Sequence, residues 1–433
     1  MRKNKYTKWF LGSIAILSLL TMGSCADEPD KYEIEGGIPT LKYIRPLTPE
    51  VSDSLLTGAY MSNSICLVGD NLRSIVAMYF NDQKAVLNTS YMTDHTVIVD
   101  VPKEIPTKVT DKIYMITKSS DTITYDFKVL VPSPSVNTMS CEYAKPGSEA
   151  TIYGDYFIDD ENVPLKITMA ENVPVTKITK ITKTAVSFIV PDNAPSGYIN
   201  VKSIYGTSRS KFQYADKRNI LFDWDGSHGG MATGHGWRNG VIKNNDPIES
   251  IDGSYLYFGG ASMLGAIGGT WAEDNFCVNY WPEPNKGYPE LSSLPEFEKM
   301  IKEYGVNNLQ VKFEAYVPTS NPWMSSALQV IFSGNSDVTF ATAGNAYYGK
   351  AELPRGLWMP WKDNGTYNTA DKWITVSIKF ADFNKKNDGS ACSTAFSKSM
   401  LTGLTLFVWH GGLAGTDCNP VICIDNIRVV PVE

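Results

Sequence analysis

The chain has 433 residues, 12% aromatic and 20% charged, and a formal net charge of −7. That length is enough for two to four domains. The acidic balance excludes functions that depend on binding a phosphate backbone, because like charges repel. The six cysteines after residue 25 lack CxxC pairs and zinc-finger spacing. A disulfide among the last four and a set of buried free thiols both remain open.

Residues 1–24 are predicted to be a targeting segment and no part of the folded protein. Basic residues at the start precede an apolar stretch over 9–22, which is too short and wrongly flanked for a membrane span. The small residues Gly23 and Ser24 before Cys25 resemble a bacterial lipobox. We therefore expect Cys25 to carry a lipid anchor, with an ordinary secretory signal as the alternative.

Residues 25–37 are predicted to form an acidic tether that contains Pro29, Gly36 and Gly37. Acidic residues directly after the lipidated cysteine resemble the surface-export signal of Bacteroidetes lipoproteins. The resemblance implies the outer face of an outer membrane. Several acyl chains would hold the protein there stably, where a single chain would not.

From residue 38 to 216 the sequence reads as short strands separated by turn residues. Residues 123–129 alternate strictly between apolar and polar, and residues 97–101 do the same. No part of this stretch has a convincing helical period. The segment is therefore predicted to be all β.

The same stretch contains a repeat. Gly69-Asp70 and Gly154-Asp155 each follow a strand, and a Val-Pro pair ends a later strand in each half, at 101–102 and 190–191. A repeat of this length predicts two β-sandwiches, over 38–132 and 133–216, with prolines 132 and 134 at the junction. The pattern resembles IPT/TIG immunoglobulin-like domains, and the first copy fits better.

Composition changes at residue 217. No tryptophan lies between Cys25 and Asn219, whereas nine lie between Trp224 and Trp409. One helix is predicted near 293–304, with Pro295 in its first turn. The other predicted elements are strands at 309–317, 327–332, 373–380, 401–409 and 421–430. Residues 217–433 are therefore predicted to form one large jelly-roll-type β-sandwich.

Five of these tryptophans are predicted to stack on a ligand: Trp281, Trp323, Trp358, Trp361 and Trp409. In residues 404–409 the aliphatic side chains share one face and Trp409 lies on the other, which is open unless both faces are buried. The other four stand near prolines in loops, where no strand period directs them into a core. We expect structural roles for Trp224 and Trp373, while Trp237 and Trp271 stay undecided.

Stacked indoles are typical of sugar binding, because the C–H face of a pyranose is flat and apolar. An enzyme is the alternative, with a carboxylate pair drawn from Asp223, Asp225, Glu273, Asp274 and Glu283. The four histidines are too scattered for a triad or a zinc site. We expect no cofactor, although Asp223, Asp225 and Asp425 could hold a structural Ca²⁺ if the first and last strands pair.

The mature chain resembles the surface glycan-binding lipoproteins of Bacteroidetes polysaccharide-utilisation systems, at the SusE/SusF position and similar to SGBP-B. The lipobox, the Gly-Asp repeat and a Trp-rich domain that closes with Asp425-Asn426-Ile427-Arg428 carry this resemblance. It implies an all-β protein of two IPT/TIG sandwiches and a glycan-binding sandwich.

The implied function is non-catalytic capture of a plant-type glycan, such as xyloglucan, mixed-linkage glucan or a mannan. The implied partners are the glycan, the outer membrane and a TonB-dependent transporter with a SusD-like protein, but no nucleic acid. A surface hydrolase or lyase and an immunoglobulin-type adhesin are the alternatives. Residues 217–433 alone are expected to keep full glycan affinity, since residues 38–216 contain no tryptophan.

Overall fold

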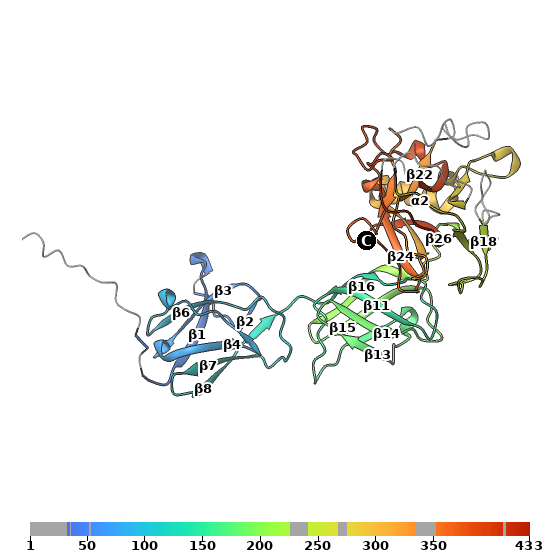
Figure 1. Cartoon of the computed structure of the whole chain (residues 1–433). Coiled ribbons are helices and arrows are strands. Elements are labelled where there is room, and N and C mark those ends of the chain that lie inside the picture. Colours follow the sequence, from blue (N-terminus) through green and yellow to red (C-terminus); the bar gives the residue numbers. More distant parts are fainter. Residues whose placement is uncertain are drawn as a thin grey trace, which may run out of the picture. The chain divides into compact units, whose positions relative to one another are not determined.

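The computed structural model describes residues 33–34, 36–51, 53–225, 241–266, 275–334, 352–409 and 413–433, without the side chains of Val241 and Trp409. The described chain is mostly β, with several sheets and one α-helix (Figure 1). None of its helices is long and apolar enough to cross a membrane. The chain divides into two compact units, residues 1–131 and 132–433, so residue 217 lies inside the second unit.

The first unit contains two main sheets, of strand order β1-β3-β6 and β5-β4-β7-β8, and a parallel pair of β2 with β9. Its strands are β1 (Thr40–Pro46), β2 (Gly58–Tyr60), β3 (Ser64–Asp70), β4 (Ile75–Phe80), β5 (Gln83–Lys84), β6 (Thr96–Asp100), β7 (Lys112–Thr117), β8 (Thr122–Asp126) and β9 (Lys128–Leu130). Three 3-10 turns accompany them, η1 (Pro49–Val51), η2 (Leu72–Ser74) and η3 (Thr89–Tyr91).

The predicted continuous strand over 123–129 is wrong, because the strand is interrupted at Phe127, between β8 and β9. β8 pairs with β7, whereas β9 pairs with β2 in a different sheet. Phe127 is buried against Phe80, with ring centroids 5.8 Å apart. The alternating pattern thus predicted strand conformation correctly on both sides of a sheet change that it did not reveal.

Each Gly-Asp motif lies where two strands approach at a bulge. The register of β1 against β3 shifts near Leu41, and that of β10 against β11 shifts near Val136. A Cβ on Gly69 would overlap the backbone oxygen of Thr40, and one on Gly154 would overlap that of Ser135. The glycine in each copy is therefore required by the close approach of a neighbouring backbone.

The two residues after each Gly-Asp pair also play equivalent parts. Asn71 and Tyr156 have positive φ angles of 58° and 61°. Leu72 and Phe157 follow them and are buried. Asparagine tolerates this conformation more readily than tyrosine, so the second copy keeps the backbone geometry although its residue is the less favoured one.

The second unit begins with a middle region, which we define as residues 132–216. Its seven strands have the order β12-β15-β16-β10-β11-β14-β13. The elements are β10 (Ser135–Met139), β11 (Glu149–Asp155), β12 (Lys166–Thr168), η4 (Ala170–Asn172), β13 (Ile178–Ile181), β14 (Ala185–Ile189), β15 (Gly197–Ser203) and β16 (Gly206–Tyr214). The first strand, β10, pairs in parallel with β16 and antiparallel with β11.

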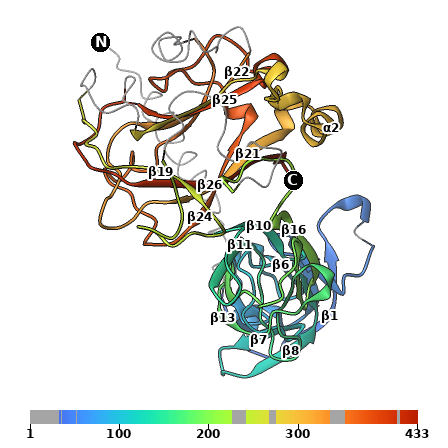
Figure 2. The ribbon, with the colours of Figure 1, turned by 90° about the vertical axis from the view of Figure 1, so that its right-hand side faces the viewer.

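The C-terminal region, residues 217–433, contains two facing sheets (Figure 2). The larger has the order β18-β19-β26-β21-β24, with β17 also paired to β26; the smaller has the order β20-β25-β22-β23. The strands are β17 (Ile220–Phe222), β18 (Val241–Lys243), β19 (Tyr255–Phe258), β20 (Cys277–Tyr280), β21 (Leu309–Tyr316), β22 (Ala327–Ser333), β23 (Gly356–Trp358), β24 (Ile374–Lys379), β25 (Gly403–Trp409) and β26 (Ile422–Pro431).

The predicted helix near 293–304 is confirmed as α2 (Pro295–Tyr304). Proline at its first position lacks an N–H that would be unpaired there anyway, and Phe297, Met300 and Ile301 form its buried face. The five predicted strands correspond to β21, β22, β24, β25 and β26. The remaining turns are η6 (Pro284–Lys286), η7 (Leu291–Ser293), η8 (Val306–Asn308), η9 (Phe380–Asp382) and η10 (Lys398–Met400).

All six cysteines after residue 25 are free thiols, so the structure has no disulfide among them. Five are buried, and Cys392 is half-buried. Of the two alternatives left by the sequence, the free-thiol one holds, and the fold is stabilised without a covalent cross-link among these residues.

Gly69→Ala is expected to destabilise the first unit by about 1–3 kcal/mol, because the new methyl group overlaps the Thr40 backbone oxygen. Urea unfolding of residues 26–433 followed by far-UV circular dichroism should show an earlier transition. Tryptophan fluorescence, which reports only residues after 219, should be unchanged. Gly36→Ala, with nothing within 4 Å of the added Cβ, is the control. An unmoved dichroism transition would contradict the close-approach explanation.

Candidate functional site

The core between the two C-terminal sheets takes up several of the tryptophans. Trp224, Trp323 and Trp361 belong to it, and Trp281 is buried as well, with 3% of its surface exposed. A ring buried in this way has no free face for a sugar. The predicted ligand contacts of Trp281, Trp323 and Trp361 are therefore wrong for the described structure, whereas the structural role expected for Trp224 is confirmed.

Trp323 shows why its loop position misled the sequence analysis. Its backbone pairs with Tyr367, each N–H donating to the other's carbonyl over 2.9 Å. This bridge draws two loops together and turns the indole inward, where none of its surface is exposed. The ring N–H donates to the carbonyl of Ser325. The core itself thus provides the cover that a loop tryptophan needs.

Trp361 is held in the same way, because its indole N–H donates to the carbonyl of Ser326 over 2.6 Å. Trp358, at the end of edge strand β23, is only half-buried. Its ring meets Phe313, Trp323 and Tyr367 edge-on, at centroid distances of 5.8, 5.3 and 5.9 Å. Among the five predicted residues, Trp358 is thus the one whose described side chain retains exposed indole surface.

The alternation predicted around Trp409 is present in β25. Leu404, Leu406 and Val408 point into the core, and Thr405 and Phe407 point to the opposite face. Phe407 is nevertheless fully buried, so that face is covered at this position. The side chain of Trp409 lies outside the described residues, and its glycan contact stays a prediction.

The outer face of the four-stranded sheet carries polar side chains that the sequence analysis did not single out. Thr405 donates to Asn279 over 2.7 Å, and Arg355 donates to Gln329 over 2.7 Å. All four are buried. Their signal in the sequence is an isolated polar residue within an otherwise apolar strand, such as Asn279 in β20 and Thr405 in β25. The four buried side chains are therefore engaged with one another by hydrogen bonds.

The acidic residues considered for chemistry that the structure describes have carboxylates engaged by neighbouring groups. Strand β17 does pair with β26, as the calcium hypothesis required. However, Asp225 accepts the backbone N–H of Ser254, and Asp425 accepts that of Asn426 over 2.8 Å. Within the described residues, no group of three or more His, Cys, Asp or Glu side chains could hold a metal ion. Glu273 and Asp274 lie outside those residues, as do His228, His235 and His410.

Trp373 packs at the edge of the sandwich, in keeping with its predicted structural role. Its indole N–H donates to the carbonyl of Glu249 over 2.9 Å, and its ring contacts Tyr255 and Tyr316. Trp237, Trp271 and Cys25 lie outside the described residues.

Comparison with known proteins decides the family. Residues 214–431 match the model described as "Surface glycan-binding protein B xyloglucan binding domain". This chain belongs to the surface glycan-binding protein B family. Its members bind glycans at the cell surface and are non-catalytic, which removes the hydrolase alternative.

The crystal structure of the surface glycan-binding protein PbSGBP-B from Prevotella bryantii is similar over nearly the whole chain. It is 40% identical, with a TM-score of 0.79, and the match covers 92% of this chain and all of that one. An IPT/TIG domain-containing protein from Bacteroides ovatus is 30% identical over 165 residues. That match covers 37% of this chain and 32% of the relative, about a third of its length.

Trp323→Ala should destabilise the C-terminal region by about 3–5 kcal/mol, because it leaves a large cavity in the core. Urea unfolding followed by fluorescence of the remaining tryptophans measures this loss. Glycan affinity, measured under conditions where the variant is folded, should stay within about twofold of the wild type. Weaker glycan binding with unchanged stability would instead show that the ring contacts the ligand.

Burial raises the pKa of Asp425 well above its ordinary value of 3.8, and the neighbouring Asp252 carboxyl raises it further. The folded state therefore keeps this proton as the pH rises past 3.8, while the unfolded state loses it. Stability conferred by the protonated group falls over that window. Asp425→Asn should thus gain stability over the wild type as the pH rises from about 4 to 7. Unfolding midpoints across that range measure the gain, and a pH-independent difference would contradict it.

Proposed function

We propose that this protein captures xyloglucan or a closely related β-glucan at the cell surface through its C-terminal region. The description of the matched family model, which covers residues 214–431, carries the choice of ligand. The similarity to the Prevotella bryantii protein over 92% of the chain supports the same mode of action for the whole protein. Mixed-linkage glucan and mannan are the neighbouring specificities to be compared.

The finer architecture is part of the proposal. Residues 38–132 and 133–216 are two immunoglobulin-like IPT/TIG domains, and residues 217–433 are a jelly-roll-type sandwich. The equivalent Gly69 and Gly154 bulges support the first assignment, as does the IPT/TIG name of the Bacteroides ovatus relative. The two facing sheets around one core support the second.

The glycan contacts are proposed for tryptophans that the core does not consume. Trp358 is half-buried at a sheet edge, and Trp409 is the last residue of β25. Trp237 and Trp271, which the sequence left undecided, join them because four of the other five tryptophans after residue 219 are buried and Trp373 is engaged at the sandwich edge. An indole is a rigid partner that loses little entropy on stacking.

The energetics suit a polysaccharide held at several points. A sugar ring that hides about 100 Å² of apolar surface on an indole gains roughly 2.5 kcal/mol before association costs. Three such stacks give roughly 7 kcal/mol gross, which lies between the roughly 4 kcal/mol of millimolar and the roughly 8 kcal/mol of micromolar affinity. Hydrogen bonds to the sugar hydroxyls add to this sum and association costs reduce it. Repeating units of a polymer then add avidity.

The anchor and the assembly are proposed on the sequence. Cys25 carries the lipid that holds the chain on the outer membrane, and residues 25–37 form the tether. A TonB-dependent transporter with a SusD-like protein would receive the glycan. No cofactor and no nucleic acid enter this function.

Affinity electrophoresis of residues 26–433 through gels with xyloglucan, mixed-linkage glucan, galactomannan or starch tests the proposal. We expect retardation by xyloglucan first. Alanine at Trp237, Trp271, Trp358 and Trp409, one at a time, should weaken binding at least about tenfold for two or more of the four. Tyr304→Ala, which removes an exposed ring from α2, is the control.

Two results would count against the proposal. The absence of retardation by every β-glucan would reject the ligand class, and retardation that survives all four substitutions would reject the assigned tryptophans. Reducing-end release in the same samples is expected to stay at background.

A further inference from the structure

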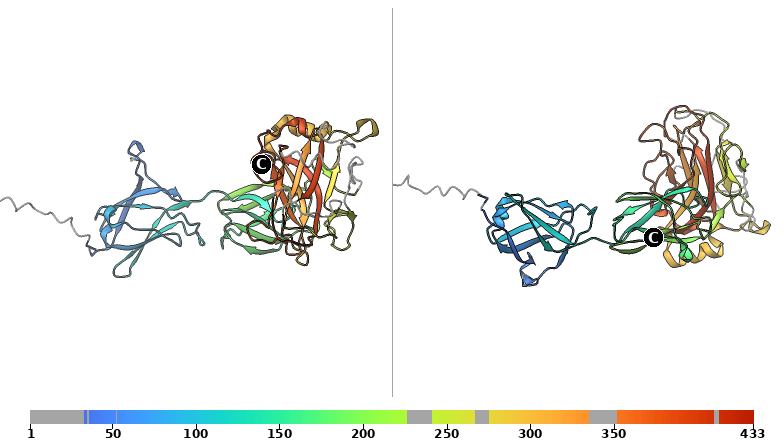
Figure 3. Two further views of the ribbon diagram at one scale, coloured as in Figure 1. Left: turned by 45° about the horizontal axis from the view of Figure 1, so that its top comes forward. Right: turned by 90° about the horizontal axis from the view of Figure 1, so that it is seen from below.

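The middle region and the C-terminal region lie side by side in the second unit (Figure 3). Residues of both regions are buried where they meet, and we call this contact the seam. The turn between β10 and β11 lies on the outer face of the larger C-terminal sheet. The N–H of Thr375 in β24 donates to the carbonyl of Ser140 over 3.0 Å, and the N–H of Glu142 donates to the Thr375 hydroxyl over 2.6 Å. These contacts fix the turn against the sheet and place the Glu142 side chain in the seam.

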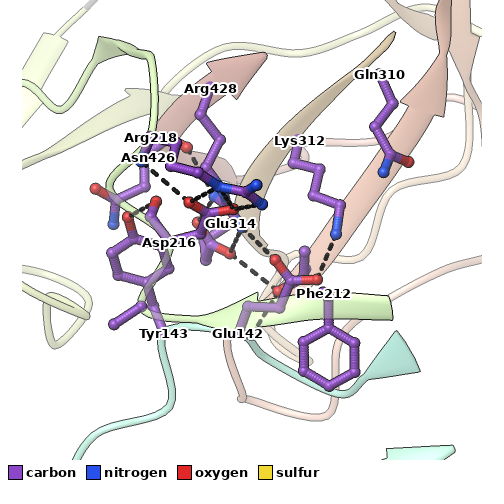
Figure 4. A network of polar contacts seen from close by, with 12 residues as sticks. Glu142, Tyr143, Phe212, Asp216, Arg218, Gln310, Lys312, Glu314, Asn426 and Arg428 are labelled. Atoms are coloured by element: carbon purple, nitrogen blue, oxygen red, sulfur yellow. Dashed lines mark hydrogen bonds and ion pairs between the residues drawn. The ribbon is translucent and has the colours of Figure 1, made fainter. Parts of the chain in front are cut away.

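Arg428 of β26 lies between two carboxylates from different regions (Figure 4). Its Nη2 donates to Oε2 of Glu142 over 2.7 Å, and its Nη1 donates to Oε2 of Glu314 over 2.7 Å. A further bond joins Nη1 to the carbonyl of Asn426 over 2.9 Å. The guanidinium carbon also lies 5.0 Å from the ring centre of Tyr143, another residue of the middle region.

Lys312 of β21 completes the group, because its Nζ lies 2.6 Å from Oε1 of Glu142. The exposed fractions are 2% for Glu142, 6% for Lys312 and 0% for both Glu314 and Arg428. Two carboxylates thus face two cations without access to solvent. The group is electrically balanced only when Glu142, from the middle region, is counted.

Contacts around this network continue the seam. Tyr143 donates to the carbonyl of Asp216 over 2.6 Å, and the Asp216 carboxylate pairs with Arg218. The hydroxyl of Tyr198 donates to Glu433 near the end of β26 over 2.6 Å. The Asp216–Arg218 pair and the Tyr198–Glu433 bond therefore also join the two regions.

The hydrophobic cores also meet at the seam. Ile251 of the C-terminal region is 5% exposed and belongs to the core of the middle region. Trp373 packs against that core and also against the cluster of Tyr255, Val421 and Cys423. The middle region is thus joined to the C-terminal region by apolar contacts as well as by charges.

We propose that residues 132–433 fold and move as one body, in which Glu142 of the middle region supplies the anion that Arg428 and Lys312 require. This inference concerns the seam and holds whichever glycan is bound. A cut at residue 217 would remove Glu142 and expose the outer face of the sheet. These contacts therefore argue against the expectation that residues 217–433 alone behave as the whole protein does.

The physical reason is that a buried charge is costly once its partner has been removed. Removing one member of a buried ion network leaves its partners uncompensated, which costs far more than breaking an exposed pair. Without the Glu142 charge, Arg428 would keep only the Glu314 carboxylate, and Lys312 would lose the carboxylate with which it pairs. A substitution in the middle region should therefore destabilise the C-terminal sandwich.

Thermal unfolding of residues 26–433, followed by tryptophan fluorescence, tests this coupling. The middle region has no tryptophan, so the signal comes only from the C-terminal region. Glu142→Gln keeps the side-chain shape and removes the charge. It should lower the fluorescence midpoint by roughly 5–10 °C.

Two controls separate the seam charge from general damage. Glu149→Gln makes the same change at an exposed residue of the middle region. Lys145→Gln removes an exposed pair that crosses the same seam, where Lys145 Nζ lies 2.5 Å from Oε1 of Glu249. Both should shift the midpoint by no more than about 2 °C.

A second variant covers the case in which Glu142→Gln does not fold. The double substitution Glu142→Gln with Lys312→Met leaves Arg428 and Glu314 as a neutral pair. Its unfolding midpoint should therefore lie above that of Glu142→Gln alone and below that of the wild type. An unchanged midpoint for Glu142→Gln would overturn the proposal, as would an equal shift from Glu149→Gln. A double variant less stable than Glu142→Gln alone would overturn it as well.

Discussion

A guanidinium group without any exposed surface requires hydrogen-bond acceptors, and the second unit is organised around one such group whose acceptors include two carboxylates. Arg428 stands near the middle of β26, the strand against which β17, β19 and β21 all pair. Its two carboxylate partners come from the adjacent strand and from a turn more than 280 residues earlier in the chain. The central strand of the sandwich and the region before it are thus linked through a single charged side chain.

Burial in the core also explains where several of the tryptophans of the C-terminal region lie. A cluster of nine indoles suggests a binding surface, because a core rarely needs so many. The structure shows that a large two-sheet sandwich can bury several of them, and the ring N–H groups of Trp323 and Trp361 donate to backbone carbonyls there. Number alone therefore does not separate core from ligand contacts. What matters is whether a loop can fold back between the sheets.

Local regularities were predictable from the sequence. Five strands of the C-terminal region (β21, β22, β24, β25 and β26), helix α2 and the family resemblance follow from periodicity, Pro295 and the Gly-Asp repeat, since each depends on neighbouring residues. The burial of Trp323 depends on a bridge to Tyr367, which is 44 positions away, and no period encodes that contact. The contact of Arg428 with Glu142 could not be predicted for the same reason, because the two residues are 286 positions apart. The break at Phe127 was missed because both flanking strands keep the same alternation.

The buried free cysteines make local opening of the second unit measurable through their reactivity. Cys141 stands beside Glu142, and Cys423 lies in β26 under the aromatic side chains at the edge of the sheet; both thiols are buried. Burial raises the pKa of each, so neither forms the reactive thiolate readily while the fold is closed. Modification by a thiol reagent therefore requires a local opening. The rate at which Cys141 and Cys423 react with such a reagent therefore measures how often the structure around them opens.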